Sequence, residues 1–182
     1  MAKKQLKEIM EALQPELSES VPIIGLEPSC VSVFRDELGN LFPGNEDAQR
    51  LAKSAVTLSE FLDRENVSLP QINRKALVQS HCHHNAIMRF TAEESVMKKM
   101  GLDFDHPDTG CCGMAGAFGF EKKHYDISIR AGERALLPKV RETRNDTLII
   151  ADGFSCREQI QQTTGRDALH LAQVLQMAFR SR

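Results

Sequence analysis

Apolar and polar residues follow one another along the chain in two different rhythms. Short, largely apolar runs are typical of buried strands, and we expect strands at Val21–Leu26, Ala76–Val78, Leu102–Phe104 and Thr147–Ala151. Longer stretches with apolar residues three or four positions apart predict helices, which we place at 4–13, 47–62, 84–100, 121–140 and 169–179. Strands that alternate with helices predict an α/β fold with a mostly parallel sheet.

One local pattern occurs twice. Two isoleucines, four spacer residues and a Ser-Cys pair end at Cys30 and again at Cys156, and a polar, helix-like run follows each time. The triplets Arg50-Leu51-Ala52 and His170-Leu171-Ala172 are then expected to open the next helix in each copy. We therefore predict two related half-modules, the first of them truncated, with residues 1–63 forming its remnant and residues 64–182 a complete module.

Composition narrows the class of protein. The chain has 182 residues and a net charge of -2, so it lacks the basic character typical of proteins that bind nucleic acid. No apolar run approaches the roughly 18 residues of a membrane span. The first residues lead into a charged, helix-forming stretch rather than a signal peptide. We expect a cytoplasmic protein, which reaches a membrane only through partners. In that compartment the five cysteines are metal ligands or redox groups rather than structural disulfides.

Four of the cysteines fall in the second half, at Cys82, Cys111, Cys112 and Cys156. The side chains of an adjacent pair diverge, which suits a cluster of several irons, because each thiolate can then bind a different iron. The segments that carry Cys82, the adjacent pair and Cys156 each follow a predicted strand. In parallel α/β folds the carboxyl ends of the strands converge. The cysteines therefore predict a metal or cluster site.

Glycines surround the adjacent cysteines at every third position, at Gly110, Gly113, Gly116 and Gly119. Glycine permits unusual backbone angles and lets amides approach a bulky inorganic ligand, so the loop backbone at the first three is expected to line the cluster. The loop has few large side chains. We therefore expect its order to depend mainly on the group that the cysteines hold.

Histidines give a competing interpretation. His81, His83 and His84 flank Cys82, and zinc accepts both cysteine and histidine ligands, so a structural zinc module is one alternative. At least one of the three imidazoles is expected to face solvent. A further alternative is a thiol–disulfide reductase, in which Cys111, Cys112 or Cys156 attacks a substrate disulfide.

Three stretches together resemble a known family. They are "SHCHHN", "GCCGMAGAFGFEKKHYDISIRAGERALLPKVR" and "IIADGFSCREQI". They are similar to the cysteine-rich CCG domain family, which includes the heterodisulfide reductase B subunit and the glycolate oxidase iron–sulfur subunit. The likeness extends from about Pro22 to Leu175, and is closest to the C-terminal iron–sulfur region of FAD-linked D-2-hydroxyacid dehydrogenases.

The resemblance implies roles for individual residues. In that family a single Cys, a Cys-Cys-Gly segment and a Cys-x-x-Cys motif hold [4Fe-4S] clusters. Cys82 matches the single Cys, Cys111 and Cys112 match the pair, and Cys156 matches the last Cys of the closing motif. Gly153 stands where the first Cys of that motif would be, so four thiolates remain, which is enough for a [4Fe-4S] cubane.

The first half matches less of the family pattern. Cys30 corresponds to the closing Cys of a preceding CCG-type module, and Glu27 stands where the other Cys of that motif would be. We also expect Cys30, His81 and His83 to be additional ligands of the metal site or to lie next to it. Zinc could replace the cluster at this site.

The function implied by the resemblance is electron transfer. The chain would be an iron–sulfur domain or subunit of an FAD-linked oxidoreductase that oxidises a 2-hydroxyacid of the D-lactate, glycolate or 2-hydroxyglutarate type. It would pass electrons from a flavin on a partner domain or subunit to a downstream acceptor. The missing first half of the cysteine-rich region would be a further partner. The isolated chain is expected to be catalytically incomplete, because it has no recognisable flavin-binding domain.

Overall fold

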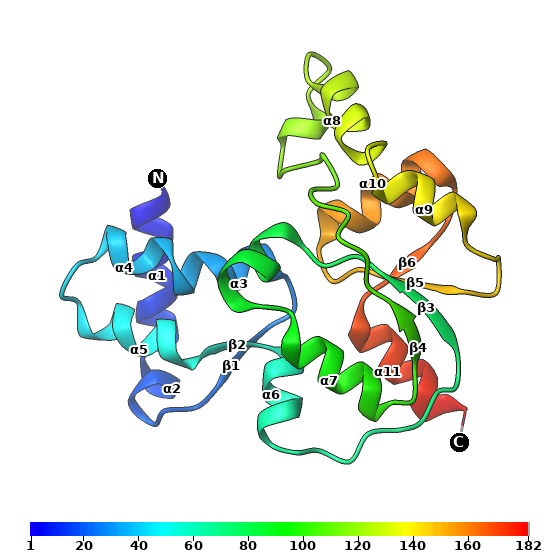
Figure 1. Cartoon of the computed structure of the whole chain (residues 1–182). Helices are drawn as coiled ribbons and strands as arrows, with labels where there is room; N and C mark the ends of the chain where they lie inside the picture. The colour runs from blue at the N-terminus through cyan, green and yellow to red at the C-terminus, as the bar shows by residue number, and fades with distance from the viewer. Residues whose placement is uncertain (182) are drawn as a thin grey trace.

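The computed structural model describes residues 1–181 and has an N-terminal lobe, residues 1–64, beside a C-terminal lobe, residues 75–181 (Figure 1). Each lobe is built on its own parallel sheet. The α/β fold with parallel strands that the sequence predicts is confirmed.

The N-terminal lobe surrounds a two-stranded sheet in which Ile23 pairs with Ala55 and Gly25 with Thr57. Its core is an apolar cluster that includes Leu6, Leu38 and Leu51, all of them buried. Its elements are α1 (Ala2–Ala12), α2 (Gln14–Ser18), β1 (Ile23–Gly25), α3 (Pro28–Arg35), α4 (Glu37–Leu41), α5 (Glu46–Ser54), β2 (Ala55–Thr57) and α6 (Leu58–Arg64).

The C-terminal lobe contains a four-stranded parallel sheet with the order β4-β3-β5-β6. Its elements are β3 (Lys75–Val78), the π-helical turn η1 (His84–Met88), α7 (Thr91–Lys99), β4 (Asp103–Asp105), the 3-10 turn η2 (Phe118–Phe120), α8 (Tyr125–Gly132), α9 (Leu136–Glu142), β5 (Leu148–Ile150), α10 (Phe154–Thr164), β6 (Ala168–Leu169) and α11 (Leu171–Arg180).

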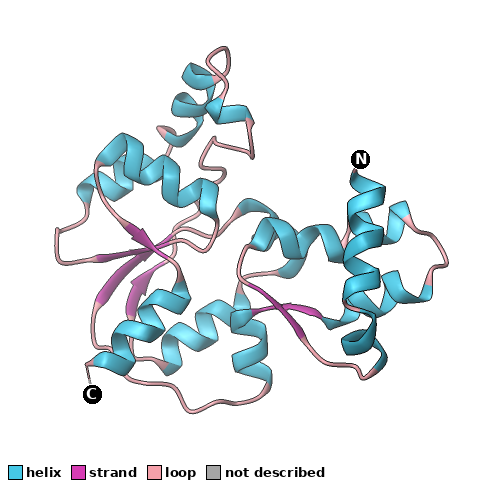
Figure 2. Cartoon of the chain, turned by 180° about the vertical axis from the view of Figure 1, so that it is seen from behind, coloured by secondary structure: helices cyan, strands magenta, loops and turns pink. Residues whose placement is uncertain are grey.

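Helices cover both faces of this sheet (Figure 2). Successive residues of a strand point to opposite faces. Ala76 and Val78 accordingly pack with side chains of α7 and α11 on one face. Leu77 and Ile149 pack with side chains of α9 and α10 on the other. The result is a three-layer sandwich whose two central strands, β3 and β5, are largely continuous apolar runs because both of their faces are buried.

The direction in which successive strands are added to the sheet reverses between β3 and β5. From β3 the chain crosses to β4 on one side, and it returns to place β5 on the other side of β3. In open α/β sheets such a point leaves a crevice outside the carboxyl ends of the two central strands. The segments that carry Cys82 and Cys156 leave these two strands at that end.

The single helix predicted for residues 47–62 is wrong. The structure has α5, then β2, then α6. The helical spacing of apolar residues continues across the strand and conceals it, but Ala55 and Val56 are buried against β1 rather than on a helix face. Thr57 then starts α6 with a capping box, in which its hydroxyl accepts from the Glu60 amide and the Glu60 carboxylate accepts from the Thr57 amide.

The helix expected at residues 84–100 is also interrupted. η1 ends at Arg89, whose φ of 59° lies in the left-handed region, and α7 begins two residues later. The single helix predicted at residues 121–140 begins later, at Tyr125, and divides into α8 and α9 with a break between Gly132 and Leu136.

The repeated triplets do not occupy equivalent positions. Arg50-Leu51-Ala52 lies inside α5, whereas Leu171 begins α11. Leu169, which the sequence pattern assigns to the closing helix, belongs to β6. The two Ile-Ile strands are nevertheless equivalent, because β1 and β5 each pair in parallel with the strand that follows the next helical segment, β2 or β6.

The two lobes are joined through packed and polar contacts. Leu58 and Leu62 of α6 pack against the apolar core of the C-terminal lobe. The Asp63 carboxylate accepts hydrogen bonds from the Ser95 hydroxyl at 2.6 Å and from the Lys99 ammonium at 2.9 Å. The module boundary at residue 63 stays a prediction. None of the helices within residues 1–181 combines the length and the apolar character that a membrane crossing needs.

Candidate metal centre

The four cysteines of the C-terminal lobe come from three places at the same end of the sheet. Cys82 follows β3, Cys111 and Cys112 lie in the loop after β4, and Cys156 is in the first turn of α10 after β5. Cys112 and Cys156 are buried, whereas Cys82 and Cys111 are exposed. The topology therefore brings together the four thiols that the sequence predicts as ligands.

The thiols interact directly with one another. Cys111 interacts with the side chains of Cys112 and Cys82, and Cys112 interacts in turn with Cys156. Hydrogen bonds from Cys112 and Cys82 lower the pKa of Cys111, whereas the contact with Cys111 raises the pKa of Cys82 and of Cys112. These thiols therefore titrate as one coupled group rather than as independent side chains.

The glycine loop is packed against its surroundings although it has few large side chains; that its order depends mainly on the group the cysteines hold stays a prediction. Met114 is almost fully buried. A Cβ atom at Gly113 would lie 2.1 Å from the Ser128 carbonyl oxygen, and one at Gly119 would lie 2.6 Å from the Ser128 hydroxyl oxygen. The loop backbone thus lies directly against α8, which glycine alone permits at these positions.

A second contact fixes the start of this loop. The buried Gln79, just after β3, donates a hydrogen bond to the Gly110 carbonyl at 3.1 Å and accepts one from the Thr109 hydroxyl. Gly110, Gly113 and Gly116 have φ values of 67°, 95° and 61°, in the left-handed region that favours glycine.

The Gly113 amide points at a thiol. It donates a hydrogen bond to the Cys111 sulfur at 3.3 Å, and this bond also lowers the Cys111 pKa. An amide aimed at a cysteine sulfur is the kind of contact that supports a thiolate bound to metal. Neither Gln79 nor Ser128 stood out in the sequence, because nothing in the local pattern indicates which loop each would hold.

The three histidines next to Cys82 have three different environments. His81 is buried, His83 is exposed, and His84 is fully buried with its Nε2 atom 2.9 Å from a carboxylate oxygen of Glu93. The prediction that at least one of them faces solvent is confirmed. The His81 and His83 rings meet edge to face, with centroids 5.5 Å apart.

Cys30 lies apart from the other four cysteines. It is exposed on α3, and it lines an apolar groove of about 780 Å³ with side chains of α1 and α4. None of the interactions described for the four thiols involves it. The structure therefore separates Cys30 from the group formed by Cys82, Cys111, Cys112 and Cys156.

The donor set was tested against a single metal ion and against a larger group. Within residues 1–181, no three His, Cys, Asp or Glu side chains surround a point where one ion could sit. The sulfur atoms instead lie against one another. Four thiols from separate segments match the donor set of a cluster, and a bound group would have to move them apart. These residues match a cluster in the number and kind of their donor atoms, and the assignment of all four as its ligands stays a prediction.

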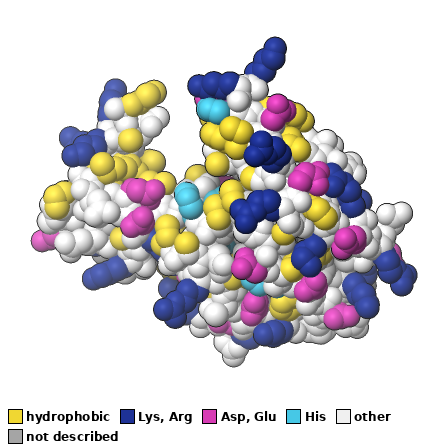
Figure 3. Space-filling view, turned by 45° about the horizontal axis from the view of Figure 1, so that its top comes forward, with side chains coloured by type: hydrophobic (Ala, Val, Ile, Leu, Met, Phe, Trp, Pro, Cys, Tyr) yellow, Lys and Arg dark blue, Asp and Glu magenta, His cyan; other side chains and the backbone are white. Residues whose placement is uncertain are grey.

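A shallow pocket of about 330 Å³ opens where the glycine loop meets the starts of α3 and α10. Phe120 and Phe154 on its wall are 55% and 51% exposed, which is high for large apolar side chains. Figure 3 shows hydrophobic side chains along the hollow between the N-terminal lobe and the larger body. The residues that line the pocket of about 330 Å³ are Glu27, Ser29, Gly116, Ala117, Phe120, Phe154 and Ser155.

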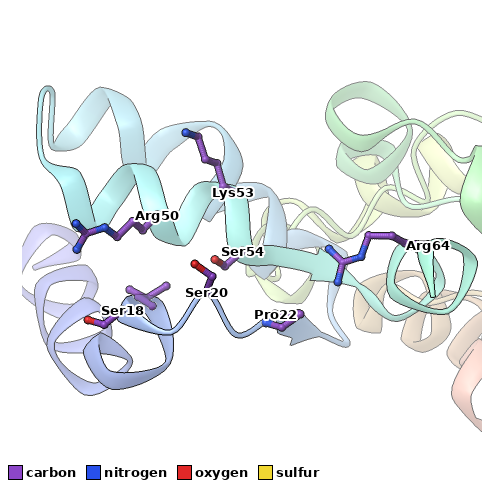
Figure 4. Close-up of a pocket in the computed structure, with 8 residues that line it drawn as sticks. Ser18, Ser20, Pro22, Arg50, Lys53, Ser54 and Arg64 are labelled. Carbon is purple, nitrogen blue, oxygen red and sulfur yellow. The ribbon is translucent and has the colours of Figure 1, made fainter.

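A different pocket, of about 480 Å³, lies between α2 and α5 and is lined by Arg50, Lys53 and Arg64 (Figure 4). Arg50 forms ion pairs with Glu46 and Asp47, both at 3.1 Å, and Arg64 pairs with a neighbouring glutamate. In Figure 4 Lys53 extends away from Ser20, and Arg64 stands at the far end. The cations do not converge on a point, so this pocket is a weaker candidate than the thiol group.

Comparison with known proteins identifies relatives among dehydrogenases. The chain is 30% identical over 163 residues to the D-2-hydroxyglutarate dehydrogenase of Pseudomonas putida, an alignment that covers 88% of this chain and 16% of that protein. It is 26% identical over 176 residues to the D-2-hydroxyglutarate dehydrogenase of Escherichia coli strain K12, covering 94% of this chain and 17% of the relative.

A third relative is one component of a larger assembly. The chain is 26% identical over 185 residues to a subunit of the anaerobic glycerol-3-phosphate dehydrogenase of Escherichia coli strain K12, an alignment that covers 98% of this chain and 46% of that relative. No protein-family model matches the chain. The chain thus spans about a sixth of the D-2-hydroxyglutarate dehydrogenases and less than half of the glycerol-3-phosphate dehydrogenase component. Along most of its length it is similar to segments of dehydrogenases.

Proposed function

We propose that the chain is an electron-transfer segment of an oxidoreductase and holds a [4Fe-4S] cluster on Cys82, Cys111, Cys112 and Cys156. The observation that carries the proposal is the convergence of these four thiols at the carboxyl ends of β3, β4 and β5. The adjacent pair favours a cluster over a single ion, because neighbouring side chains diverge and can each reach a different iron.

The surrounding residues suit such a group. Met114 and Ile160 belong to the same buried apolar cluster as Cys112 and Cys156, so half of the donor set is kept from water. The Gly113 amide donates to the Cys111 sulfur, which would stabilise that thiolate. When bound, a cluster of this kind accepts and passes on single electrons, and the protein supplies its position, its hydrogen bonds and its isolation from solvent.

The relatives suggest the reaction that supplies the electrons. Their names describe the oxidation of D-2-hydroxyglutarate and of glycerol 3-phosphate, both of which carry a hydroxyl group on a carbon that is oxidised. We assign this chain to an oxidoreductase of that kind acting on a 2-hydroxyacid, in the cytoplasm. A flavin on another domain or subunit would take up the electron pair, and a downstream acceptor would receive the electrons. The exposed Phe120 and Phe154 near the thiols would face that partner.

Anaerobic reconstitution tests the proposal. The purified chain, incubated with ferrous iron, sulfide and a thiol reductant, should bind about four irons and four sulfides per chain. It should show the visible absorption of an iron–sulfur cluster, and dithionite should bleach this absorption and produce an EPR signal. Failure to bind sulfide-containing iron under these conditions would overturn the proposal.

Two other functions have a specific observation in their favour. Four cysteines also form the donor set of structural zinc sites, so a zinc module is one alternative. The exposed Cys111, whose pKa is lowered by hydrogen bonds with Cys112 and Cys82, could also attack a disulfide, as in a thiol–disulfide reductase. Tight uptake of one zinc without iron would support the first, and reduction of a model disulfide by the metal-free chain the second.

A further inference from the structure

His81 and Gly153 compete for the same space beside the thiols. Gly153 is the residue before α10, and a Cβ atom built there would lie 2.5 Å from Cδ2 and 3.1 Å from Cγ of the His81 ring. The shorter of these distances is below what non-bonded carbon atoms tolerate, so either the ring or the added side chain would have to move. A side chain at position 153 and the ring of His81 therefore exclude each other.

The position of Gly153 gives this exclusion a meaning. Gly153 lies three residues before Cys156, where a Cys-x-x-Cys motif would have its first cysteine. The imidazole of His81, which comes from the segment after β3, occupies the place of a side chain from the segment after β5. An imidazole therefore occupies the space that the side chain of the first cysteine of such a motif would take.

The His81 ring is buried but lacks a complete set of partners. The side chain is 8% exposed, and its Nδ1 atom has no hydrogen-bond partner. A buried polar atom without a partner costs about 1–3 kcal/mol, so most such atoms in proteins have one. The Cδ2 edge of the ring faces Gly153, and Nδ1 is therefore on the opposite edge.

The groups around His81 are those of the candidate metal centre. Burial lowers the pKa of His81, and the Glu27 carboxylate and the Cys111 thiolate act in the other direction by attracting a proton to the ring. His83 and His84 lower it further.

We propose that His81 is a positioning residue of the metal centre: its ring fills the space that a side chain at position 153 would occupy, and its unpartnered Nδ1 atom would donate a hydrogen bond to a sulfur of the bound cluster. Hydrogen bonds to cluster sulfurs raise the reduction potential, because they stabilise the more negative, reduced form. His81 thereby sets the potential of the cluster without being a ligand. This inference rests on the proposed cluster.

Redox titration of reconstituted protein, followed by EPR, tests the inference. His81→Leu should keep the iron content of the wild type and shift the reduction potential to a more negative value. His81→Gln, which retains an N–H donor, should stay closer to the wild type. Asn85→Leu is the control, because this polar side chain is exposed in the same segment, and it should leave the potential unchanged.

Gly153→Ala provides a second test that leaves His81 itself in place. The added methyl group should displace the ring, and so shift the potential in the same direction as His81→Leu. In the double variant with His81→Ala, the shift should be no larger than with His81→Ala alone. Without any cluster, Gly153→Ala should lower the melting temperature, and His81→Ala should suppress that loss.

The possible failures are distinguishable. If the wild-type chain binds no cluster, the proposed function and this inference fail together. If it binds one and the potentials of wild type, His81→Leu and His81→Gln coincide, only the inference fails. Loss of the cluster from both His81 variants would show that the ring holds the metal rather than tunes it, and would also contradict the inference.

Discussion

The carboxylate of Glu27 accepts a hydrogen bond from the backbone N–H of Phe154 at 2.8 Å, across 127 residues of sequence. Phe154 is the first residue of α10, and Gly153, which precedes it, has no side chain to cap the helix. Glu27 therefore caps, from the N-terminal lobe, the helix that carries Cys156. The other Glu27 oxygen accepts from the Ser29 hydroxyl at 2.9 Å, which orients the carboxylate.

Replacing Glu27 should loosen the contact between the two lobes. Glu27→Ala leaves the Phe154 amide without its acceptor and removes a negative charge from a helix N-terminus, so we expect a loss of about 1 kcal/mol in the free energy of unfolding. Glu27→Gln keeps an acceptor and should cost less than half as much. Urea unfolding measures both, with Glu19→Ala, at an exposed glutamate of the same lobe, as the control. Equal stabilities for Glu27→Ala and the control would show that the cap contributes nothing.

A buried polar group forms another joint between the lobes. Glu93 on α7 is 1% exposed, accepts a hydrogen bond from the Thr57 hydroxyl at 3.1 Å, and lies 2.9 Å from the fully buried His84. Glu93→Ala should lower the free energy of unfolding by about 3 kcal/mol, because it leaves the buried Thr57 hydroxyl without its acceptor and removes the carboxylate beside the buried His84. Thr57→Val should cost about 1 kcal/mol, because it removes one hydrogen bond.

Glu94 is the matched control for this joint. It is the next residue on α7 and is partly exposed, with His106 and Lys98 as partners. Its replacement by alanine should cost under about 1 kcal/mol, as is usual for surface ion pairs. Denaturant unfolding that gives Glu93→Ala and Glu94→Ala the same stability would contradict the role assigned to the buried group.

The sequence predicted the strands after which the cysteines follow, because β3 and β5 are short apolar runs buried on both faces. It could not predict β2, since the apolar spacing of α5 continues through Ala55 and the strand depends on pairing with β1, 32 positions earlier. The convergence of the thiols could be anticipated from the parallel topology. The contacts of Gln79 and Glu27 could not, because both depend on partners distant in sequence.

Gly113 and Gly116 have similar sequence contexts, but the packing around them in the glycine loop differs. Gly113→Ala places a Cβ atom 2.1 Å from the Ser128 carbonyl oxygen at a φ of 95°, so it should displace the loop from α8. Gly116 has a φ of 61° and open space around its Cα. Gly116→Ala should cost only the roughly 1 kcal/mol of a left-handed alanine.

Thermal unfolding of the metal-free chain distinguishes these two variants. Gly113→Ala should lower the melting temperature by several degrees more than Gly116→Ala, and hydrogen exchange should become faster in residues 109–119. If both variants behave alike without metal, the loop is not held by α8, and the cysteines would be its main source of order.

The measurement that tests the central claim most directly is the iron and sulfide content of cysteine-to-serine variants after anaerobic reconstitution. Cys82→Ser, Cys111→Ser and Cys156→Ser should each lose most of the bound iron and the visible absorption, because each removes one of four thiols that contact one another. Cys30→Ser should keep the full content, because Cys30 lines the groove beside α1 instead. Equal losses from Cys30→Ser and Cys82→Ser would contradict the assignment of the metal centre.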